Sequence, residues 1–202
     1  MTQKGLNEGR LRERGLRFKT ALGQLTHIET QEANDDETID FTEVFTDDYD
    51  RYVAFIDNFL PRDDRDNPFI RLSSDGGSTW DSGTSDYGHS HFRVREDGST
   101  ASFGDGADDR LQITNQAVQT DPNENDTGGY SITISDPTNS SRSTVVRASS
   151  AEHRHDATAF ASQIGGGIRL SQSSVDSIQF LVLDSEGGAI SSGIFSVYGV
   201  DK

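Results

Sequence analysis

The sequence predicts an all-β protein: an antiparallel β-sandwich or jelly roll that follows a short, basic N-terminal arm able to form a helix. Two observations support this fold class. Short segments along most of the chain alternate apolar and polar residues, which is the period of a strand with one buried face. Turns rich in Asp, Gly, Asn and Ser separate these segments, as expected for an antiparallel sheet. No internal repeat is present, so the pattern does not favour a propeller or a solenoid.

The expected strands follow one another from residue 25 to the end of the chain. Eleven are expected at residues 25–30, 38–45, 51–60, 69–74, 89–95, 100–103, 110–114, 130–135, 143–148, 157–162 and 168–171. The last 26 residues hold two more, one with Ile178 and Phe180 on one side and one with Phe195 and Val197 on one side. Because Gly187-Gly188 can supply a positive-φ turn between them, we expect a hairpin that closes the sandwich.

Charge divides the chain into a predicted arm, residues 1–24, and a predicted sandwich domain, residues 25–202. Residues 1–30 hold six basic and three acidic residues, net +3, so the remaining 172 residues are net −19. Leu11, Phe18 and Leu22 lie at helical spacing, with Arg14 and Arg17 between them. We expect this arm to dock on an acidic partner surface through its apolar face and its arginines. The alternative is a frayed, solvated terminus.

The whole chain is acidic, with 34 Asp and Glu against 18 Lys and Arg and a net charge of −16. Asp outnumbers Glu by 24 to 10, and the only lysines are Lys4, Lys19 and Lys202. Short carboxylates hold water and cations, and high salt screens their repulsion, so this composition favours a halophilic source, with an archaeon expected. A mesophilic acidic protein is the alternative. The strand pattern argues against disorder of the whole chain.

Composition also excludes several classes of function. The acidic body would repel phosphate, so we expect no nucleic-acid partner. The first residues lack the apolar segment of a signal peptide, and the strongest apolar runs are four residues long, against the ~20 needed to span a bilayer. We therefore expect synthesis in the cytoplasm without membrane insertion. Cysteine is absent, which excludes disulfides and cysteine nucleophiles.

The final strand carries a motif with the spacing Ser-Gly-x-Phe-x-x-Tyr-Gly, formed by Ser192, Gly193, Phe195, Tyr198 and Gly199. Shorter motifs precede it in order at residues 38–41, 48–52, 60–61, 72–79 and 87–91. Together they resemble a group of small β-sandwich structural proteins of tailed viruses, the bacteriophages and archaeal head-tailed viruses. The resemblance covers residues 25–200 and leaves out the arm. It implies a virion structural protein, either a capsid decoration or turret protein or a tail-fibre or baseplate subunit.

One motif invites an enzymatic interpretation. Residues 73–80 match the Asp-box pattern Ser-x-Asp-x-Gly-x-Thr-Trp of sialidase-like propellers, in which the Asp accepts backbone donors across a tight hairpin. That motif is a folding device, and one copy cannot build a propeller. A glycan-cleaving site would also need paired carboxylates, or a tyrosine nucleophile with an arginine cluster. No such set is visible, and no phosphate loop or serine-nucleophile elbow occurs, so we expect no enzymatic activity and no required cofactor.

Two kinds of residue are candidate metal ligands. Within each of the pairs His89/His91 and His153/His155 the residues are two positions apart, which places each pair on one face of a strand. Neutral imidazoles suit Zn, Ni or Cu, although ordinary polar positions on a wet sheet face are the alternative. Acidic loops would take Na, K, Mg or Ca casually; they hold Asp47, Asp48 and Asp50, then Asp63, Asp64 and Asp66, then Asp105, Asp108 and Asp109, and finally Asp121, Asn123, Asn125 and Asp126. The last begins like a calcium loop, but Asp126 replaces the turn glycine, so it is not an EF-hand.

Two functional hypotheses therefore stand side by side. In the first, the chain is a virion protein that forms a homo-oligomer, a trimer or pentamer, and attaches to other virion proteins through its arm. In the second, it is a lectin-like jelly-roll module that binds host surface glycan, with Trp80, Tyr87 and Tyr130 as sugar-stacking faces. A glycan-cleaving enzyme is a third, less favoured hypothesis.

Overall fold

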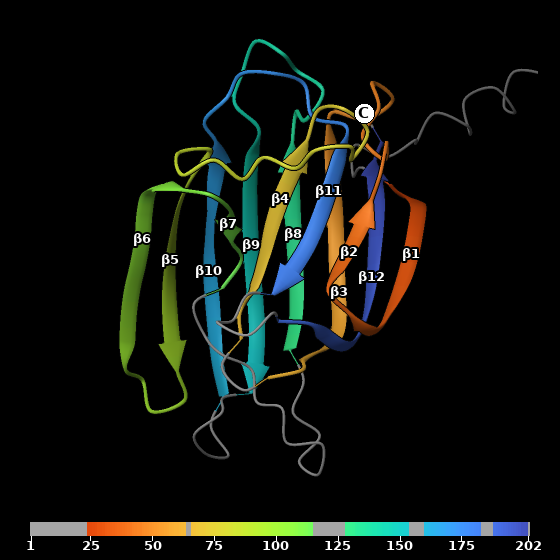
Figure 1. Cartoon of the computed structure of the whole chain (residues 1–202). Coiled ribbons are helices and arrows are strands. Elements are labelled where there is room, and N and C mark those ends of the chain that lie inside the picture. Colours follow the sequence, from red (N-terminus) through yellow and green to blue (C-terminus); the bar gives the residue numbers. More distant parts are fainter. Residues whose placement is uncertain (1–23, 64–65, 115–127, 154–159, 183–187, 202) are drawn as a thin grey trace, which may run out of the picture.

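The computed structural model describes residues 24–63, 66–114, 128–153, 160–182 and 188–201. This part of the chain forms two antiparallel sheets that pack face to face, so the predicted β-sandwich is confirmed (Figure 1). No helix occurs among the described residues, and none is therefore long and apolar enough to cross a membrane. The predicted arm lies outside the described residues.

The larger sheet has eight strands in the order β1-β12-β3-β8-β9-β10-β5-β6. Their bounds, in that order, are Leu25–Asp36, Ile190–Val200, Arg51–Pro61, Gly128–Ser135, Val145–His153, Phe160–Arg169, Tyr87–Arg95 and Thr100–Asp108. The smaller sheet has four strands in the order β2-β11-β4-β7, with bounds Thr38–Phe41, Ser177–Val182, Pro68–Ser73 and Leu111–Gln112. The edges of the larger sheet are β1 and β6, so these two strands lie on opposite sides of the molecule (Figure 1).

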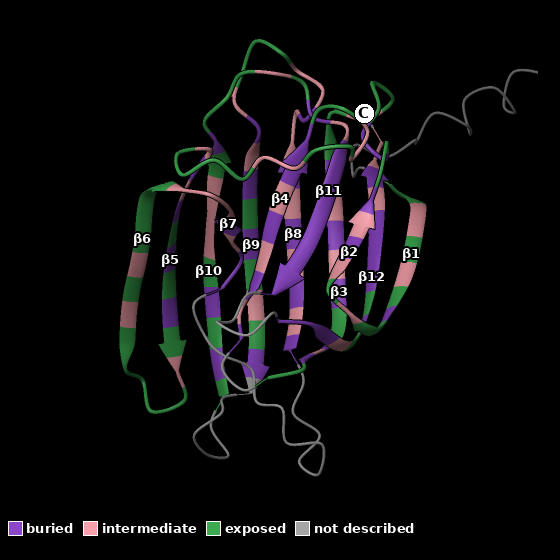
Figure 2. Ribbon diagram, in the orientation of Figure 1, coloured by how far each residue is buried: buried purple, intermediate pink, exposed green. Residues whose placement is uncertain are grey.

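The hydrophobic core fills the space between the two sheets. Phe41 and Phe180 contribute to it from the smaller sheet, and Phe59 and Phe195 from the larger one; all four are buried. Along the strands of the larger sheet, residues alternate between this core and solvent, most regularly in β8 and β5 (Figure 2). The period-two pattern seen in the sequence is therefore the pattern of burial.

The predicted C-terminal hairpin is wrong. β11 pairs with β2 and β4 in the smaller sheet, whereas β12 pairs with β1 and β3 in the larger sheet. All six residues of β11 are buried, so this strand occupies the middle of the smaller sheet rather than the end of a hairpin. The chain thus crosses from one sheet to the other between Val182 and Ile190.

Two smaller differences concern strand lengths. The strand expected at residues 38–45 ends at Phe41, because the backbone of Phe45 leaves the sheet and donates a hydrogen bond to the carbonyl of Asp176 (3.0 Å). The strands expected at residues 157–162 and 168–171 are replaced by one continuous strand, β10. Gly165-Gly166-Gly167 lies in the middle of that strand, between the two ranges that the sequence predicts as separate strands.

Candidate functional site

The predicted Asp-box turn is formed and acts as a structural element. Asp75 Oδ1 accepts a hydrogen bond from the backbone N–H of Thr79 (2.9 Å), and its Oδ2 accepts one from the Thr79 hydroxyl (2.7 Å). These bonds and the Ser73 hydroxyl lower the pKa of Asp75. The turn is closed by a hydrogen bond from the Asp81 N–H to the carbonyl of Leu72 (2.9 Å). The carboxylate of Asp75 thus holds the loop in place through these hydrogen bonds.

Of the three aromatic residues proposed as sugar contacts, only Trp80 is partly exposed. Tyr87 and Tyr130 are buried, so neither ring can stack on a bound sugar, and this part of the prediction is wrong. The Tyr87 hydroxyl accepts a hydrogen bond from the Leu72 N–H (2.8 Å). The Tyr130 hydroxyl donates to Glu152 Oε2 (2.8 Å). Burial raises the pKa of both tyrosines, as expected for hydroxyls sealed inside the sandwich.

His89 and His91 point inward from β5 and lie side by side, with ring centroids 5.4 Å apart. Burial lowers the pKa of both, and burial together with the neighbouring His89 lowers the pKa of His91 to about 4. Asp108 Oδ2 lies 3.9 Å from His89 Nδ1 and opposes the shift at His89. Both rings are therefore neutral at pH 7, which is the form that binds metal.

The position of the second histidine pair relative to the first is not described, so the prediction of a metal site is not tested. His155 and the side chain of His153 lie outside what the structure describes. Among the described residues, no three His, Asp or Glu side chains are grouped closely enough to hold a metal ion. Asp109 is instead paired with Arg71 and Arg110, at 3.3 Å and 3.2 Å. The calcium-like segment at residues 121–126 also lies outside the described residues. Metal binding by the two histidine pairs stays a prediction.

Among the described carboxyl groups, the pKa of Glu152 on β9 is raised furthest; this side chain faces the core and is 2% exposed. Four side chains donate hydrogen bonds to it: the hydroxyls of Thr114 (2.7 Å), Tyr130 (2.8 Å) and Ser150 (3.4 Å), and the amide of Gln163. Burial raises the pKa of Glu152 to about 7, although these hydrogen bonds oppose the shift. This cluster is enclosed between the sheets and offers no route to a substrate that the described residues reveal.

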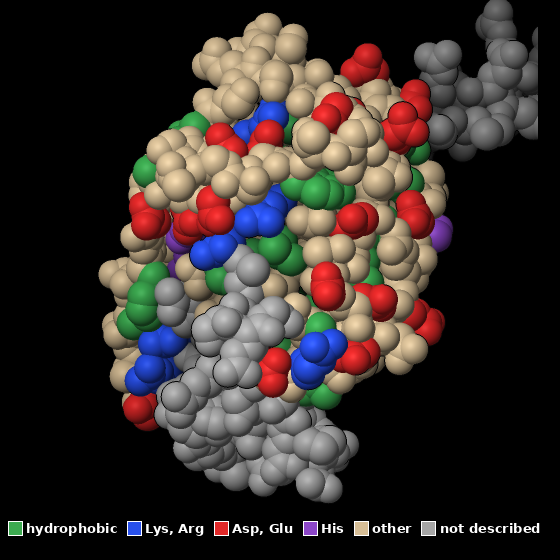
Figure 3. All heavy atoms as spheres, in the orientation of Figure 1, with side chains coloured by type: hydrophobic (Ala, Val, Ile, Leu, Met, Phe, Trp, Pro, Cys, Tyr) green, Lys and Arg blue, Asp and Glu red, His purple; other side chains and the backbone are tan. Residues whose placement is uncertain are grey.

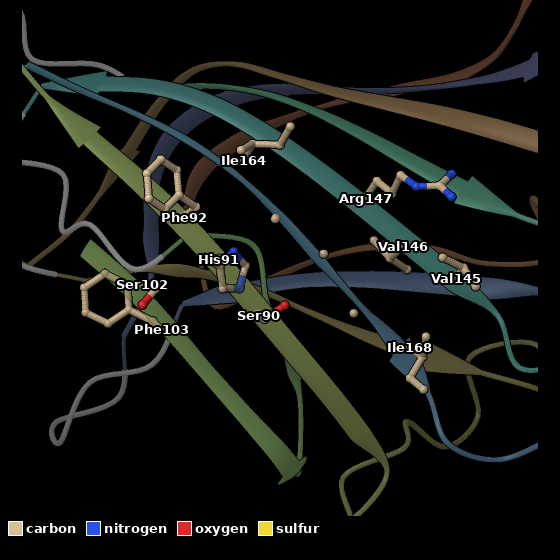
Figure 4. Close-up of a pocket in the computed structure, with 13 residues that line it drawn as sticks. Ser90, His91, Phe92, Ser102, Phe103, Val145, Val146, Arg147, Ile164 and Ile168 are labelled. Atoms are coloured by element: carbon tan, nitrogen blue, oxygen red, sulfur yellow. The ribbon is translucent and has the colours of Figure 1, made fainter. Parts of the chain in front are cut away.

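The outer face of β5, β10 and β9 forms a shallow groove of about 580 Å³ (Figure 4). Its floor is the backbone of Gly165-Gly166-Gly167. Ile164 and Ile168 stand at either end of this glycine run, and Phe92 lies beside Ile164 (Figure 4). Ile164 is 65% exposed and Phe92 47% exposed, which is unusual for side chains of this kind.

The glycines are required by the close approach of the neighbouring strands. A Cβ atom at Gly166 would overlap the carbonyl oxygen of Val146 on β9, and one at Gly165 would overlap the ring of His91 on β5. A Cβ at Gly167 would overlap the carbonyl oxygen of Gly88. Gly166 is the one glycine of the three that faces outward, so the groove follows from the missing side chain at this position, between the exposed Ile164 and Ile168.

This face is also nearly free of negative charge. β5, β8 and β10 contain no acidic residue, and the one in β9, Glu152, points into the core. Arg147 is the one charged side chain among the described residues that line the groove. Figure 3 views the molecule from the side of the smaller sheet, where Asp and Glu side chains are scattered over the surface. The apolar, carboxylate-free surface over β5, β10 and β9 is called the outer face from here on.

Comparison of the chain with protein-family models, with curated proteins and with solved structures finds no match. The arm residues Leu11, Arg14, Arg17, Phe18 and Leu22 lie outside the described residues, so the attachment hypothesis stays a prediction.

Sequence reasoning missed the outer face and the Glu152 cluster. The sequence did contain a signal for the first: three consecutive glycines between two isoleucines in a strand-forming region. Nothing near residue 152 distinguishes Glu152 from the other nine glutamates, because its burial depends on Thr114, Tyr130 and Gln163, which are distant in sequence.

Proposed function

We propose that this chain is a non-enzymatic structural protein of a virus particle, from a tailed virus whose host is a halophile, with an archaeon as the expected host. Within the particle it serves as a capsid decoration or turret protein, or as a tail-fibre or baseplate subunit. It works by presenting a rigid sandwich in a homo-oligomer and by attaching to other virion proteins through its arm.

The observation that carries the proposal is the outer face. Monomeric soluble proteins rarely expose contiguous apolar patches larger than a few hundred Å², and patches above that size mark interaction sites. Here Phe92, Ile164 and Ile168 are exposed together on a chain whose net charge is −16. A protein whose work is assembly needs a surface of this kind, whereas a freely diffusing acidic protein would be expected to cover it with carboxylates.

The sequence motifs that resemble those of tailed-virus proteins support the same role. The segment at residues 38–41 coincides with β2, Leu60-Pro61 ends β3, and the Ser-Gly-x-Phe-x-x-Tyr-Gly motif lies within β12. These three motifs thus fall on strands that build the sandwich. The Asp excess and the near absence of lysine support the halophilic setting.

Glycan binding is the alternative function. The groove of the outer face offers an aromatic ring, Phe92, with the hydroxyls of Ser90 and Ser102 and the cationic Arg147 nearby. Trp80, which is partly exposed, remains as a second candidate contact. A shallow trough with an aromatic wall and a few polar groups can hold a sugar ring. The groove is mostly apolar, however, which fits a protein partner better.

The main proposal is tested by peptide mass spectrometry of virus particles purified from cells that encode the chain. Immunogold labelling of the same particles would locate the protein on the head or the tail. We expect the protein in the particles at a stoichiometry set by their symmetry. Its absence from intact particles would contradict the proposal. Binding to a glycan array at micromolar concentration, lost in Phe92→Ala, would favour the alternative function.

A further inference from the structure

We propose that two copies of this chain pack face to face through the outer face and are related by a two-fold axis. The axis lies between the two copies, parallel to the sheets and perpendicular to the strands, and it passes over β10 at the level of Gly165. This deepens the assembly role proposed above by naming the contact surface and the partner. It can fail without that role failing, because the arm or another surface could hold the particle together.

A second copy is the partner that the charge distribution favours. Two bodies of the same strong negative charge repel each other wherever their carboxylates meet. The outer face is where such a body can be approached without that cost, because β5, β8 and β10 carry no acidic residue. A basic partner would gain more from the carboxylate-rich surfaces elsewhere. Another copy of this chain carries the same negative charge, so the outer face is the surface on which it can bind with least repulsion.

The register of the strands makes the outer face complementary to itself. At the level of Ile164 the outward residues are Phe92 on β5, Ile164 on β10 and Ser149 on β9. Two residues further along β10, at the level of Gly166, they are Ser90, Gly166 and Arg147. On β5 and β10, the level of Ile164 thus carries two large apolar side chains, whereas the level of Gly166 carries two small residues.

The proposed axis exchanges these two levels between the copies while each strand faces its own counterpart. Ile164 then projects into the gap above the partner's Gly166, and Phe92 lies over the partner's Ser90. On β9, Ser149 leaves room for the partner's Arg147. Each projecting side chain therefore meets a small residue, and by symmetry the same contacts form twice.

The next pair of levels follows the same rule. Val94, Ser162 and Ala151 are level with one another, as are Gly88, Ile168 and Val145. Under the proposed axis, Ile168 faces the partner's Ser162, and Val94 faces the partner's Gly88. An axis parallel to the strands would instead place Ile164 against the partner's Ile164 and Gly166 against the partner's Gly166. That would create a collision and a void, so the perpendicular axis is the one that packs.

The available surface is large enough for a stable contact. The three strands of the outer face, spaced ~4.8 Å apart and each ~30 Å long, present roughly 430 Å² in projection. The neighbouring β8 and β6 bring the total to roughly 700 Å², close to the ~800 Å² per partner of a standard interface. Two sheets related in this way pack ~10 Å apart, as the sheets of a sandwich do. This contact closes a dimer, whereas the sequence led us to expect a trimer or pentamer.

Sedimentation equilibrium of the full chain in about 1 M salt, where the Debye length is ~3 Å, tests the contact. Ile168→Glu on the outer face should raise the dimer dissociation constant by roughly 100-fold or more, as expected for a charge placed in an apolar contact. The matched control is Ile194→Glu. Ile194 lies on β12 of the same sheet and is equally exposed, at 37%, but outside the outer face. It should leave the dimer intact.

An exchange of two residues tests the axis itself. Ser90→Phe and Phe92→Ser should each weaken the dimer, because one adds a second projecting ring and the other removes the ring that fills the gap. The double variant moves the ring from one level to the other in both copies, so it should restore most of the affinity. Both positions are exposed in one copy, and circular dichroism should confirm that every variant folds.

Three results would overturn the proposal: a monomer at every concentration, equal behaviour of the two glutamate variants, or an oligomer of any size that Ile168→Glu leaves intact. Failure of the double variant to recover would overturn the two-fold geometry. None of these results bears on whether the protein is found in purified particles.

Discussion

Phe180 of the smaller sheet and Phe195 of the larger sheet pack against each other across the core, with ring centroids 5.4 Å apart and ring planes 47° apart. Phe195 also lies 6.5 Å from Phe59 on its own sheet, and Phe180 lies 6.0 Å from Phe41 on its own. The four rings form a continuous aromatic cluster that joins the two sheets. The last strand therefore closes the sandwich by packing across it.

Phe195→Ala should destabilise the protein by about 3–5 kcal/mol, the usual cost of removing a fully buried aromatic ring. Chemical denaturation monitored by circular dichroism measures this loss. The neighbouring control is Ile194→Ala, whose side chain points to solvent from the same strand and should cost well under half as much. Comparable costs for the two variants would mean that β12 does not face the core as described.

Gly166→Ala should be destabilising by roughly 1–3 kcal/mol or more, because the new methyl group meets backbone that cannot move aside cheaply. Gly129→Ala is the control: Gly129 lies on β8 of the same sheet, and a Cβ atom there meets nothing within 4 Å. This change should be neutral or stabilise slightly, since alanine restricts the unfolded chain. Equal melting temperatures for the two variants would argue against the close approach of β9 and β10.

The sequence was sufficient to predict the sandwich class and most strand positions, because period-two burial is a local property. It was not sufficient to predict strand partners. Gly187-Gly188 between two apolar strands favoured a hairpin, yet β12 pairs with β1, whose residues lie some 160 positions earlier. The choice depends on burial of both faces of β11, which no local pattern encodes.

The candidate site was less predictable than the fold. Tyr87 and Tyr130 looked like surface aromatics because their segments are rich in polar residues, but their hydroxyls find Leu72 and Glu152 in the core. The complementarity of the outer face depends on which residues of β5 and β10 are level, and that register is fixed by the folded sheet alone.

Glu152→Gln should change how stability depends on pH. The folded pKa of Glu152 is about 7 and its ordinary value 4.5, so the folded state holds this proton more tightly than the unfolded state. Its contribution is fully present below about pH 4.5 and is lost as pH rises through about 7, a difference of about 3 kcal/mol. The variant, which cannot ionise, should therefore gain stability relative to the wild type over that range.

The comparison must be made as a difference between the two proteins, because His91 acts in the opposite direction. Its lowered pKa makes the folded state lose stability as pH falls from about 6.5 through about 4. Urea melts at several pH values, with Glu32→Gln as an exposed control, would isolate the Glu152 contribution. A difference that stays constant between about pH 5 and about pH 8 would show that Glu152 is not buried as described.

Folding should depend strongly on salt if the halophilic interpretation holds. The Debye length falls from ~30 Å at 0.01 M to ~3 Å at 1 M, so salt should relieve most of the repulsion within a chain of net charge −16. Thermal melts should show a rise of several degrees between these conditions. Sucrose at matched osmolarity separates screening from general exclusion. A flat response to salt would remove the halophilic argument.

The last prediction concerns the arm. β1 begins at Leu25 on an edge of the larger sheet, where the carbonyl of Gln24 accepts a hydrogen bond from the N–H of Asp201 (3.0 Å). The outer face centres on β10, near the opposite edge, so the strand that follows the arm is not part of the outer face.

Deleting residues 1–22 should therefore leave the sandwich folded and its dimer intact, but abolish incorporation into particles, because the segment holds most of the local positive charge that can pair with acidic partners. A milder variant, Arg14→Glu with Arg17→Glu, keeps the length of the arm and should also reduce incorporation. Particles that package the truncated protein normally would place the attachment contact on the sandwich itself. Loss of the dimer on truncation would instead assign the arm to self-association.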